Sequence, residues 1–415
     1  MRLLHWAVVG ISIAPAILEA QEARDFFAPL TDGDGQRYPL ALSPAIWNVL
    51  GPITMAPGTD GLTHVPYVIR LTNKSGSPMT LQSVDTVNPH DGNTLTGTNR
   101  ILTIKNEDVT GDVLPFLAPA TLDATNYSRT LDAGLSGAIY MDVTYSNRNE
   151  VPDYISHRIV VSQLTDGSTQ TYAAIDAPIA VDKREPIILS PPLRGARWLD
   201  GNGCCREIGP HRWALTPING DIEPAEMFAI DFVQLNEDSS GYKGDIHDLT
   251  SYAFYGTEVY AAAAGTVVEV VRDLPNEVPG ANPAHPTAEK AAGNHVIVDV
   301  GGGRYILYAH LAPYSPAVHA GDFIQRGYVL GKLGNSGNTD GPHLHFQVMD
   351  RPSALGAHGL PFVFDHMVRS YRFANSLADE VAQYSAGLPL SLVPTANPVR
   401  FENTMPLTLD LVDFR

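Results

Sequence analysis

The sequence predicts an all-β protein with more than one domain. Its 415 residues exceed the usual size of a single domain, and runs of alternating apolar and polar residues recur between turn clusters. With 36 glycines and 32 prolines, turns must be frequent, which favours short strands over long helices. A hydrophobic content of 44% indicates a folded chain, and a net charge of −18 disfavours a nucleic-acid partner.

Residues 1–20 have the pattern of a secretory signal peptide. Arg2 precedes an almost wholly apolar run over 3–18, and small residues stand at Ala20 and Ala23 before the sequence turns polar. The apolar run is too short for a membrane span. We therefore expect an exported protein, periplasmic or secreted, with no stable membrane insertion after cleavage.

Residues 38–188 predict a β-sandwich accessory domain. Short strand-like runs are separated there by turn clusters at intervals typical of a sandwich. The histidines of this region are scattered, and no grouping has catalytic spacing. The predicted strands cover Val65–Thr72, Ile101–Ile104, Gly137–Tyr145, Ile155–Val161 and Tyr172–Ile175, with turns at Asn73–Pro78, Asp91–Asn93 and Asp166–Ser168.

A proline-rich linker over 184–195 leads to a second β-rich domain over 198–371. Its clearest strands begin at Gly265, His295 and Arg304. Residues 372–415 form a C-terminal tail with a short predicted helix around 376–384, and we expect the tail to pack on one of the two domains.

The only two cysteines are neighbours, Cys204 and Cys205. A disulfide between adjacent residues closes a small strained ring, and no metal-binding spacing surrounds the pair. We therefore expect two incidental thiols in a glycine-rich loop.

The strongest chemical signal is a pair of histidines two residues apart, His343 and His345. On a strand both imidazoles point to one face, where they can hold a metal together or divide metal binding and proton transfer between them. The glycine-rich approach over 334–342 allows a tight loop to come close to that face.

Two further elements supply candidate groups. His310 ends an alternating run, and strict alternation places Tyr308 on its face. Asp231 stands in an otherwise apolar run, so its carboxylate must be paired, hydrogen-bonded or metal-bound to offset desolvation.

Six segments resemble, in their order, those of the lysostaphin/LytM-type zinc metalloendopeptidases. The resemblance covers roughly residues 225–350 and implies an antiparallel β catalytic domain with one zinc ion. By the family pattern Asp231 and His345 are zinc ligands, and His343 and His310 are catalytic. The segments are Gly256-Thr-Glu-Val-Tyr-Ala-Ala-Ala-Ala-Gly-Thr-Val-Val, Gly293-Asn-His-Val, Tyr308-Ala-His-Leu, Gly321-Asp, Gly331-Lys-Leu-Gly-Asn-Ser-Gly and Gly341-Pro-His-Leu-His-Phe.

The family's first ligand, a histidine four residues before the aspartate, is replaced here by Met227. We predict that His211 takes its place, brought beside Asp231 across adjacent strands by a hairpin around Asn219-Gly-Asp. His247 and His295 are the weaker alternatives.

The resemblance implies an exported zinc endopeptidase, with peptidoglycan cross-links as the expected substrate and a general secreted endopeptidase as a variant. A bound zinc ion would activate water, and we expect His343 to transfer its proton and His310 with Tyr308 to donate to the oxyanion. The alternative is a catalytically inactive, metal-free relative that binds the cell wall or a partner. A carbohydrate-binding sandwich protein is a third hypothesis, for which no aromatic platform is evident.

Overall fold

The computed structural model describes residues 43–89, 109–110, 130–205, 209–215, 217–281 and 287–414. The predicted signal peptide, the strand over 101–104 and the turn at Asp91 lie outside these residues. Strands dominate the described chain, as the all-β prediction requires. No helix among the described residues is long and apolar enough to cross a membrane.

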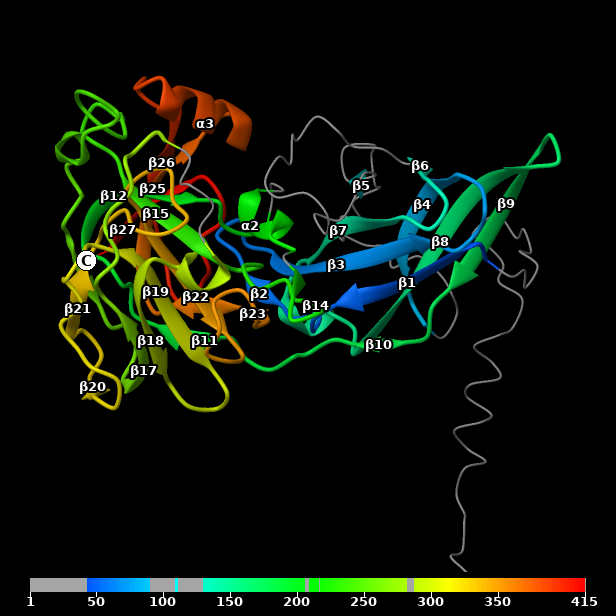
Figure 1. The fold of residues 1–415 in the computed structure, drawn as a ribbon, viewed down its shortest axis with the longest axis horizontal. Coiled ribbons are helices and arrows are strands. Elements are labelled where there is room, and N and C mark those ends of the chain that lie inside the picture. Colours follow the sequence, from blue (N-terminus) through cyan, green and yellow to red (C-terminus); the bar gives the residue numbers. More distant parts are fainter. Residues whose placement is uncertain are drawn as a thin grey trace, which may run out of the picture.

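The N-terminal part consists of two sheets around one core (Figure 1). Inward side chains of β3 and β7 face those of β4 and β8, so the apolar residues of each strand are buried between the two sheets. The first sheet contains β1 (Ala45–Leu50), β2 (Ala56–Pro57), β3 (Thr63–Asn73), β5 (Val109–Thr110) and β7 (Ser136–Tyr145). The second contains β4 (Met79–Val87), β6 (Thr130–Leu131), β8 (Tyr154–Thr165), β9 (Ser168–Ile175) and β10 (Ile179–Ala180).

The C-terminal part is built on one large antiparallel sheet, ordered β20-β17-β18-β19-β22-β15-β12-β27-β25-β26, with β23 beside β22. Its central strands are apolar because their inner face packs on aromatic rings such as Phe346 and Trp198. The strands are β12 (Gly195–Gly201), β15 (Ile230–Gln234), β17 (Gly265–Val271), β18 (Asn294–Asp299), β19 (Tyr305–Leu311), β20 (Phe323–Ile324), β22 (Leu344–Met349), β23 (Gly359–Leu360), β25 (Met367–Phe373), β26 (Leu392–Phe401) and β27 (Asp410–Phe414).

Short elements complete this part. Three two-stranded sheets pair β11 (Ile187–Leu189) in parallel with β24 (Phe362–Phe364), β13 (Pro217–Ile218) with β14 (Asp221–Ile222), and β16 (Glu258–Tyr260) with β21 (Val329–Lys332). The described helices are α2 (Pro210–Trp213), α3 (Leu377–Ser385) and the one-turn 3₁₀ helices η2 (Arg148–Glu150), η3 (Leu249–Ser251) and η4 (Ala288–Lys290).

The two parts are joined by a shared apolar cluster. It unites Val68 and Tyr140 of the first sheet with Met227, Phe228 and other side chains of the C-terminal part. Polar contacts cross the same boundary, since Met405 N donates to the carbonyl of Pro57 at 2.9 Å. The N-terminal sheets are therefore packed on the C-terminal sheet and do not hang from it by a linker alone.

The expectation of two incidental thiols was wrong. Cys204 and Cys205 form a disulfide, with their Cα atoms 3.1 Å apart across a cis peptide bond. Both residues are buried in the shared apolar cluster.

The C-terminal tail packs on the large sheet. β26 and β27 extend that sheet, and α3 begins at a capping box formed by Ser376 and Asp379, which confirms the predicted helix. Tyr242 donates to the carbonyl of Ser385 at 3.1 Å and fixes the end of α3. Glu380 on this helix is only 7% exposed.

Glu380 makes stability depend on pH. Burial, with the charge of Asp340 adding to it, raises the pKa of Glu380 to about 7 from 4.5. A carboxyl whose folded pKa is raised contributes stability below pH 4.5 that is lost as pH rises through 7. Glu380→Gln should therefore match the wild type at pH 4 and exceed it above pH 7 by at most about 3 kcal/mol.

Urea unfolding at a series of pH values measures this difference, with exposed Glu402→Gln as the matched control. A pH-independent difference between Glu380→Gln and the wild type would contradict the burial argument.

Candidate active site

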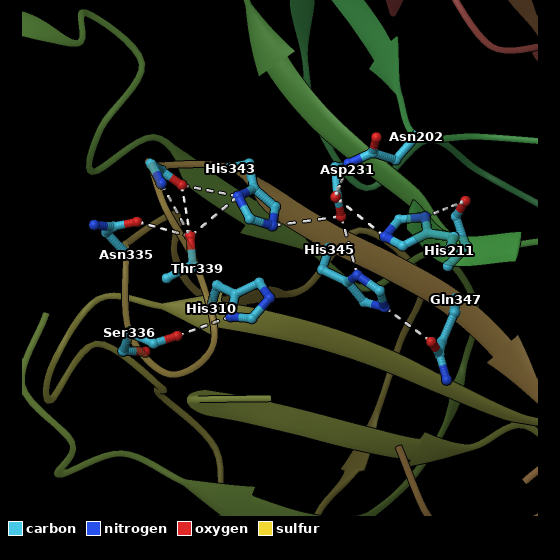
Figure 2. A network of polar contacts seen from close by, with 12 residues as sticks. Asn202, His211, Asp231, His310, Asn335, Ser336, Thr339, His343, His345 and Gln347 are labelled. Carbon is cyan, nitrogen blue, oxygen red and sulfur yellow. Dashed lines mark hydrogen bonds and ion pairs between the residues drawn. The ribbon is translucent and has the colours of Figure 1, made fainter. Parts of the chain in front are cut away.

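Asp231 is the centre of a cluster of imidazoles on the large sheet (Figure 2). It lies on β15, paired with Gly201 of β12 and with His345 of β22. Burial alone would raise the pKa of Asp231, but the facing imidazoles of His211 and His343 hold it well below its usual value. The carboxylate is therefore charged, and the surrounding rings compensate its desolvation.

His345 is fixed at both ring nitrogens. Nδ1 lies 3.0 Å from Asp231 Oδ1, and Nε2 lies 2.8 Å from Gln347 Oε1. The amide nitrogen of Gln347 donates to the carbonyl of Ala354 at 3.2 Å, so its oxygen faces the ring. His345 Nε2 must then donate to Gln347, which leaves the lone pair of Nδ1 directed toward Asp231.

His343 lies just before β22, where it bridges to Gly334 of the glycine-rich loop. Its Nδ1 donates to the carbonyl of Gly341 at 2.8 Å. Nε2 lies 3.4 Å from Asp231 Oδ1. Both imidazoles thus turn to the same side of the strand, as the spacing of two residues predicted (Figure 2).

His310 approaches from β19. Nδ1 donates to the carbonyl of Ser336 at 2.8 Å, and the ring centroid lies 4.6 Å from that of His343. Burial lowers the pKa of His310 well below its ordinary value, and His343 and His345 add to the effect. The ring is therefore neutral, with its proton on Nδ1 and a lone pair on Nε2.

The structure does not place Tyr308 at this cluster. Its hydroxyl accepts a hydrogen bond from the backbone N of Ala262 in the apolar core, and its ring packs on Phe346. The reason is a bulge: the pairing of β18 with β19 shifts register here, and His310 has φ of +61°. Strict alternation fails, so Tyr308 and His310 point to opposite sides.

His211 lies beside Asp231, although the predicted route was wrong. Its Nε2 is 3.1 Å from Asp231 Oδ2, and its Nδ1 donates to the carbonyl of Ala229 at 3.0 Å. His211 belongs to the four-residue helix α2 and not to a strand adjacent to β15, whose partners are β12 and β22. The hairpin around Asn219 exists, but only as the short β13–β14 pair.

Residue 227, where the family has a histidine ligand, is an apolar packing residue in this chain. Met227 is 4% exposed and belongs to the apolar cluster shared with the N-terminal sheets.

Burial would lower the pKa of His211, but Asp231 raises it to about 9. The two alternatives bond elsewhere, His247 to the carbonyl of Pro279 and His295 to the carbonyl of Gly293.

The donor set fits a cation. Each of the four imidazoles donates one N–H outward, so its other ring nitrogen faces inward, toward the carboxylate of Asp231 or the neighbouring rings. Such a cluster repels itself unless protons or a metal ion lie between the groups. Donor atoms of His211, Asp231 and His345 all lie within 4.8 Å of one another, and so do those of His310, His343 and His345.

A cavity of about 410 Å³ opens over the cluster. Ala291 and Ala292, at the end of the insertion between β17 and β18, line it beside the acidic side chains of Glu226 and Asp340. The four clustered histidines and Asp231 also line this cavity, so a substrate that enters it meets all five groups.

Sequence analysis missed the residues that orient the cluster. Asn202 Nδ2 donates to Asp231 Oδ2 at 2.9 Å from the loop after β12, and Ser336 supplies the carbonyl that holds His310. Gln347 was accessible to sequence reasoning, because it stands two residues beyond His345 on the same face of a strand. Asn202 carries no such signal.

Residues 247–356 match the family described as Peptidase family M23, so this part of the chain is similar to the peptidases of that family. This confirms the predicted resemblance. The matched segment contains His310, His343 and His345, whereas His211 and Asp231 precede it.

Peptidoglycan DD-endopeptidase ShyA of Vibrio cholerae serotype O1 is 32% identical over 112 residues, which are 27% of this chain and 22% of ShyA. The catalytic domain of lysostaphin from Staphylococcus simulans is 23% identical, covering 40% of this chain and 88% of that domain at a TM-score of 0.23. A zinc-containing peptidase from Vibrio cholerae is 14% identical, covering 84% and 92% at a TM-score of 0.24. The aligned part thus spans about a fifth of ShyA.

The loop that holds His310 depends on close backbone approach at Gly337. Its φ is +90°, and a Cβ there would collide with the backbone of Gly293 and lie 2.6 Å from the carbonyl of Ala291. Gly337→Ala should displace the neighbouring Ser336 carbonyl and release the Nδ1 proton of His310. We expect a stability loss larger than the about 1–2 kcal/mol of a left-handed alanine alone.

Gly303→Ala is the matched control, because Gly303 has φ of +65° but open space around its Cβ position. Urea unfolding and the ring-proton NMR signals of His310 provide the measurement. Equal losses in the two variants, with the His310 signal unchanged, would contradict the packing argument.

Proposed function

We propose that the protein is an exported zinc-dependent endopeptidase that hydrolyses peptide bonds in peptidoglycan cross-links. The observation that carries the proposal is the convergence of four anchored imidazoles around one carboxylate, that of Asp231, in the lining of a cavity. The Peptidase family M23 match and the similarity to ShyA, a peptidoglycan DD-endopeptidase by name, support the substrate class. The signal-like N-terminus supports export.

His211, Asp231 and His345 would hold the zinc ion. Two imidazoles and a carboxylate are a common catalytic zinc set, which leaves a fourth position for water or substrate. Their outer partners, the carbonyl of Ala229 and the amide oxygen of Gln347, fix the orientation of each ring. A bound zinc ion supplies Lewis acidity to a peptide carbonyl and to a water molecule.

His343 is proposed to move the proton. Its Nδ1–H is held by the carbonyl of Gly341, so Nε2 is free to accept a proton from the attacking water. The same nitrogen lies 3.4 Å from Asp231 Oδ1, beside the proposed zinc ligands. As the carbonyl–nitrogen bond breaks, Nε2 returns that proton to the leaving amine.

The predicted role of His310 as oxyanion donor does not fit its surroundings. The ring is neutral, and its one proton is committed to the carbonyl of Ser336. Nε2 therefore accepts a hydrogen bond and does not donate one. We assign His310 to orienting the attacking water beside His343. The core position of Tyr308 removes the second predicted donor.

Removal of a ligand should remove the metal. The purified wild type is expected to contain about one zinc ion per chain and to lose peptide hydrolysis on chelation. His211→Ala and His345→Ala should weaken zinc binding by more than the roughly 10- to 100-fold that loss of an outer partner costs. His295→Ala, which changes a histidine bonded elsewhere, is the control.

Competition with a fluorescent chelator measures the affinities. Full hydrolysis by thoroughly metal-free protein would refute the zinc proposal in favour of a metal-independent role. Zinc loss in His295→Ala but not in His211→Ala would refute the assignment of His211.

Loss of the proton carrier should spare the metal. His343→Gln is expected to bind zinc as the wild type does and to hydrolyse cross-linked peptides about 10²–10⁴-fold more slowly. His319→Gln is the control, because the side chain of His319 is 75% exposed and distant from the cavity. Turnover by His343→Gln within a few-fold of the control would rule His343 out as the proton carrier.

A further inference from the structure

The helix that supplies His211 cannot hold its own position. α2 has only four residues, and its N-cap, Gly209, makes no side-chain capping bond. A single helical turn gains too few hydrogen bonds to offset the entropy of ordering it. The position of the His211 ring must therefore be set by contacts of α2 with the rest of the chain.

The next residue, Arg212, makes two of these contacts. Arg212 is 2% exposed, and its guanidinium bridges two backbone carbonyls. Nη1 donates to Cys205 at 2.9 Å, and Nη2 donates to Met141 at 2.8 Å. Met141 belongs to β7, a strand of the N-terminal sandwich. One side chain thus ties the helix of a candidate metal ligand to the other domain, at the place where α2 meets the sandwich in Figure 1.

The residues that Arg212 bonds lie at the shared apolar cluster between the two domains. Cys205 is held in the shared apolar cluster, together with Tyr140 next to Met141 and with Met227. Position 227, where the family has a ligand, is thus occupied by a residue of the cluster shared with the sandwich, and His211 lies on a segment that bonds to the sandwich through Arg212.

We propose that the N-terminal domain is part of the metal site, with Arg212 as the positioning residue that holds His211 against Asp231. The inference rests on the proposed function, because it takes His211 to be a ligand. Arg212 acts through its neighbour and does not reach the cavity. A planar guanidinium suits this task, since it presents two parallel donors to carbonyls of two different segments, which one ammonium group cannot match.

Arg369 offers a matched control. It too crosses the boundary between the parts, where Nη1 donates to the carbonyl of Thr59 at 3.1 Å and pairs with Asp410 at 3.3 Å. It lies on β25, away from α2. Arg369→Met therefore removes an interdomain arginine without touching the helix of His211.

The experiment uses the full chain and zinc itself. Zinc affinity is measured by chelator competition for the wild type, Arg212→Met, Arg212→Lys and Arg369→Met, and thermal unfolding is measured on the metal-free forms. We expect Arg212→Met to bind zinc about 10- to 100-fold more weakly and Arg212→Lys to recover only part of that loss. Arg369→Met should lower the unfolding temperature and keep the wild-type zinc affinity.

The absorption spectrum of the cobalt-substituted protein reports on the metal ligands and does not change when a variant is merely less stable. The ligand-field absorption bands should change in Arg212→Met and stay constant in Arg369→Met. Should Arg212→Met fail to fold, Arg212→Lys carries the same comparison. Wild-type zinc affinity and cobalt bands in the Arg212 variants would overturn the proposal, and so would equal zinc losses in Arg369→Met.

His345→Ala separates this proposal from the proposed function. If neither the wild type nor His345→Ala binds zinc, the zinc assignment itself fails and the positioning proposal falls with it. If His345→Ala loses zinc while Arg212→Met does not, the zinc site stands and only the role of the N-terminal domain is refuted.

Discussion

A buried carboxylate among imidazoles is the constraint on which the rest of this structure depends. Asp231 stands in an apolar strand with 13% of its side chain exposed, so its charge must be compensated from within the protein. The facing nitrogens of His211, His343 and His345 do this at 3.0–3.4 Å. β22 brings His345 to it, the residue just before β22 is His343, and α2 brings His211.

The anchoring of the rings explains why the cluster is suited to chemistry. Carbonyls and an amide oxygen take the outer N–H of each ring, so tautomer and orientation are both fixed before any ligand enters. The inner nitrogens differ in surroundings. Those of His211 and His345 lie against Asp231, whereas the rings of His310 and His343 lie together on the loop side, with centroids 4.6 Å apart. One cluster thereby offers a place to hold a metal and a place to move a proton.

The sequence was a good guide where regular structure carries the residues and a poor one where it does not. Spacing on a strand put His343 and His345 on one side, and hydrophobic runs located β15, β17 and β19. Tyr308 was misplaced because a register shift at His310 is invisible to alternation. Sequence analysis found His211 for the wrong reason, since contact with another domain, and not strand pairing, holds its helix.

The contacts between the two domains also give the N-terminal sandwich a structural role at the site. The sequence alone indicated no catalytic or binding role for this domain. In the structure the Met141 carbonyl of its β7 accepts a hydrogen bond from Arg212, and its apolar side chains belong to the same cluster as Met227. Neither contact could be predicted, because each joins segments about 70 or more residues apart through side chains with no periodic pattern.

Anomalous diffraction at the zinc absorption edge, from crystals of the full chain grown with zinc, tests the central claim most directly. The account predicts one peak about 2.0–2.2 Å from His211 Nε2, a carboxylate oxygen of Asp231 and His345 Nδ1. A peak centred on His310, His343 and His345, or no peak near Asp231, would contradict it.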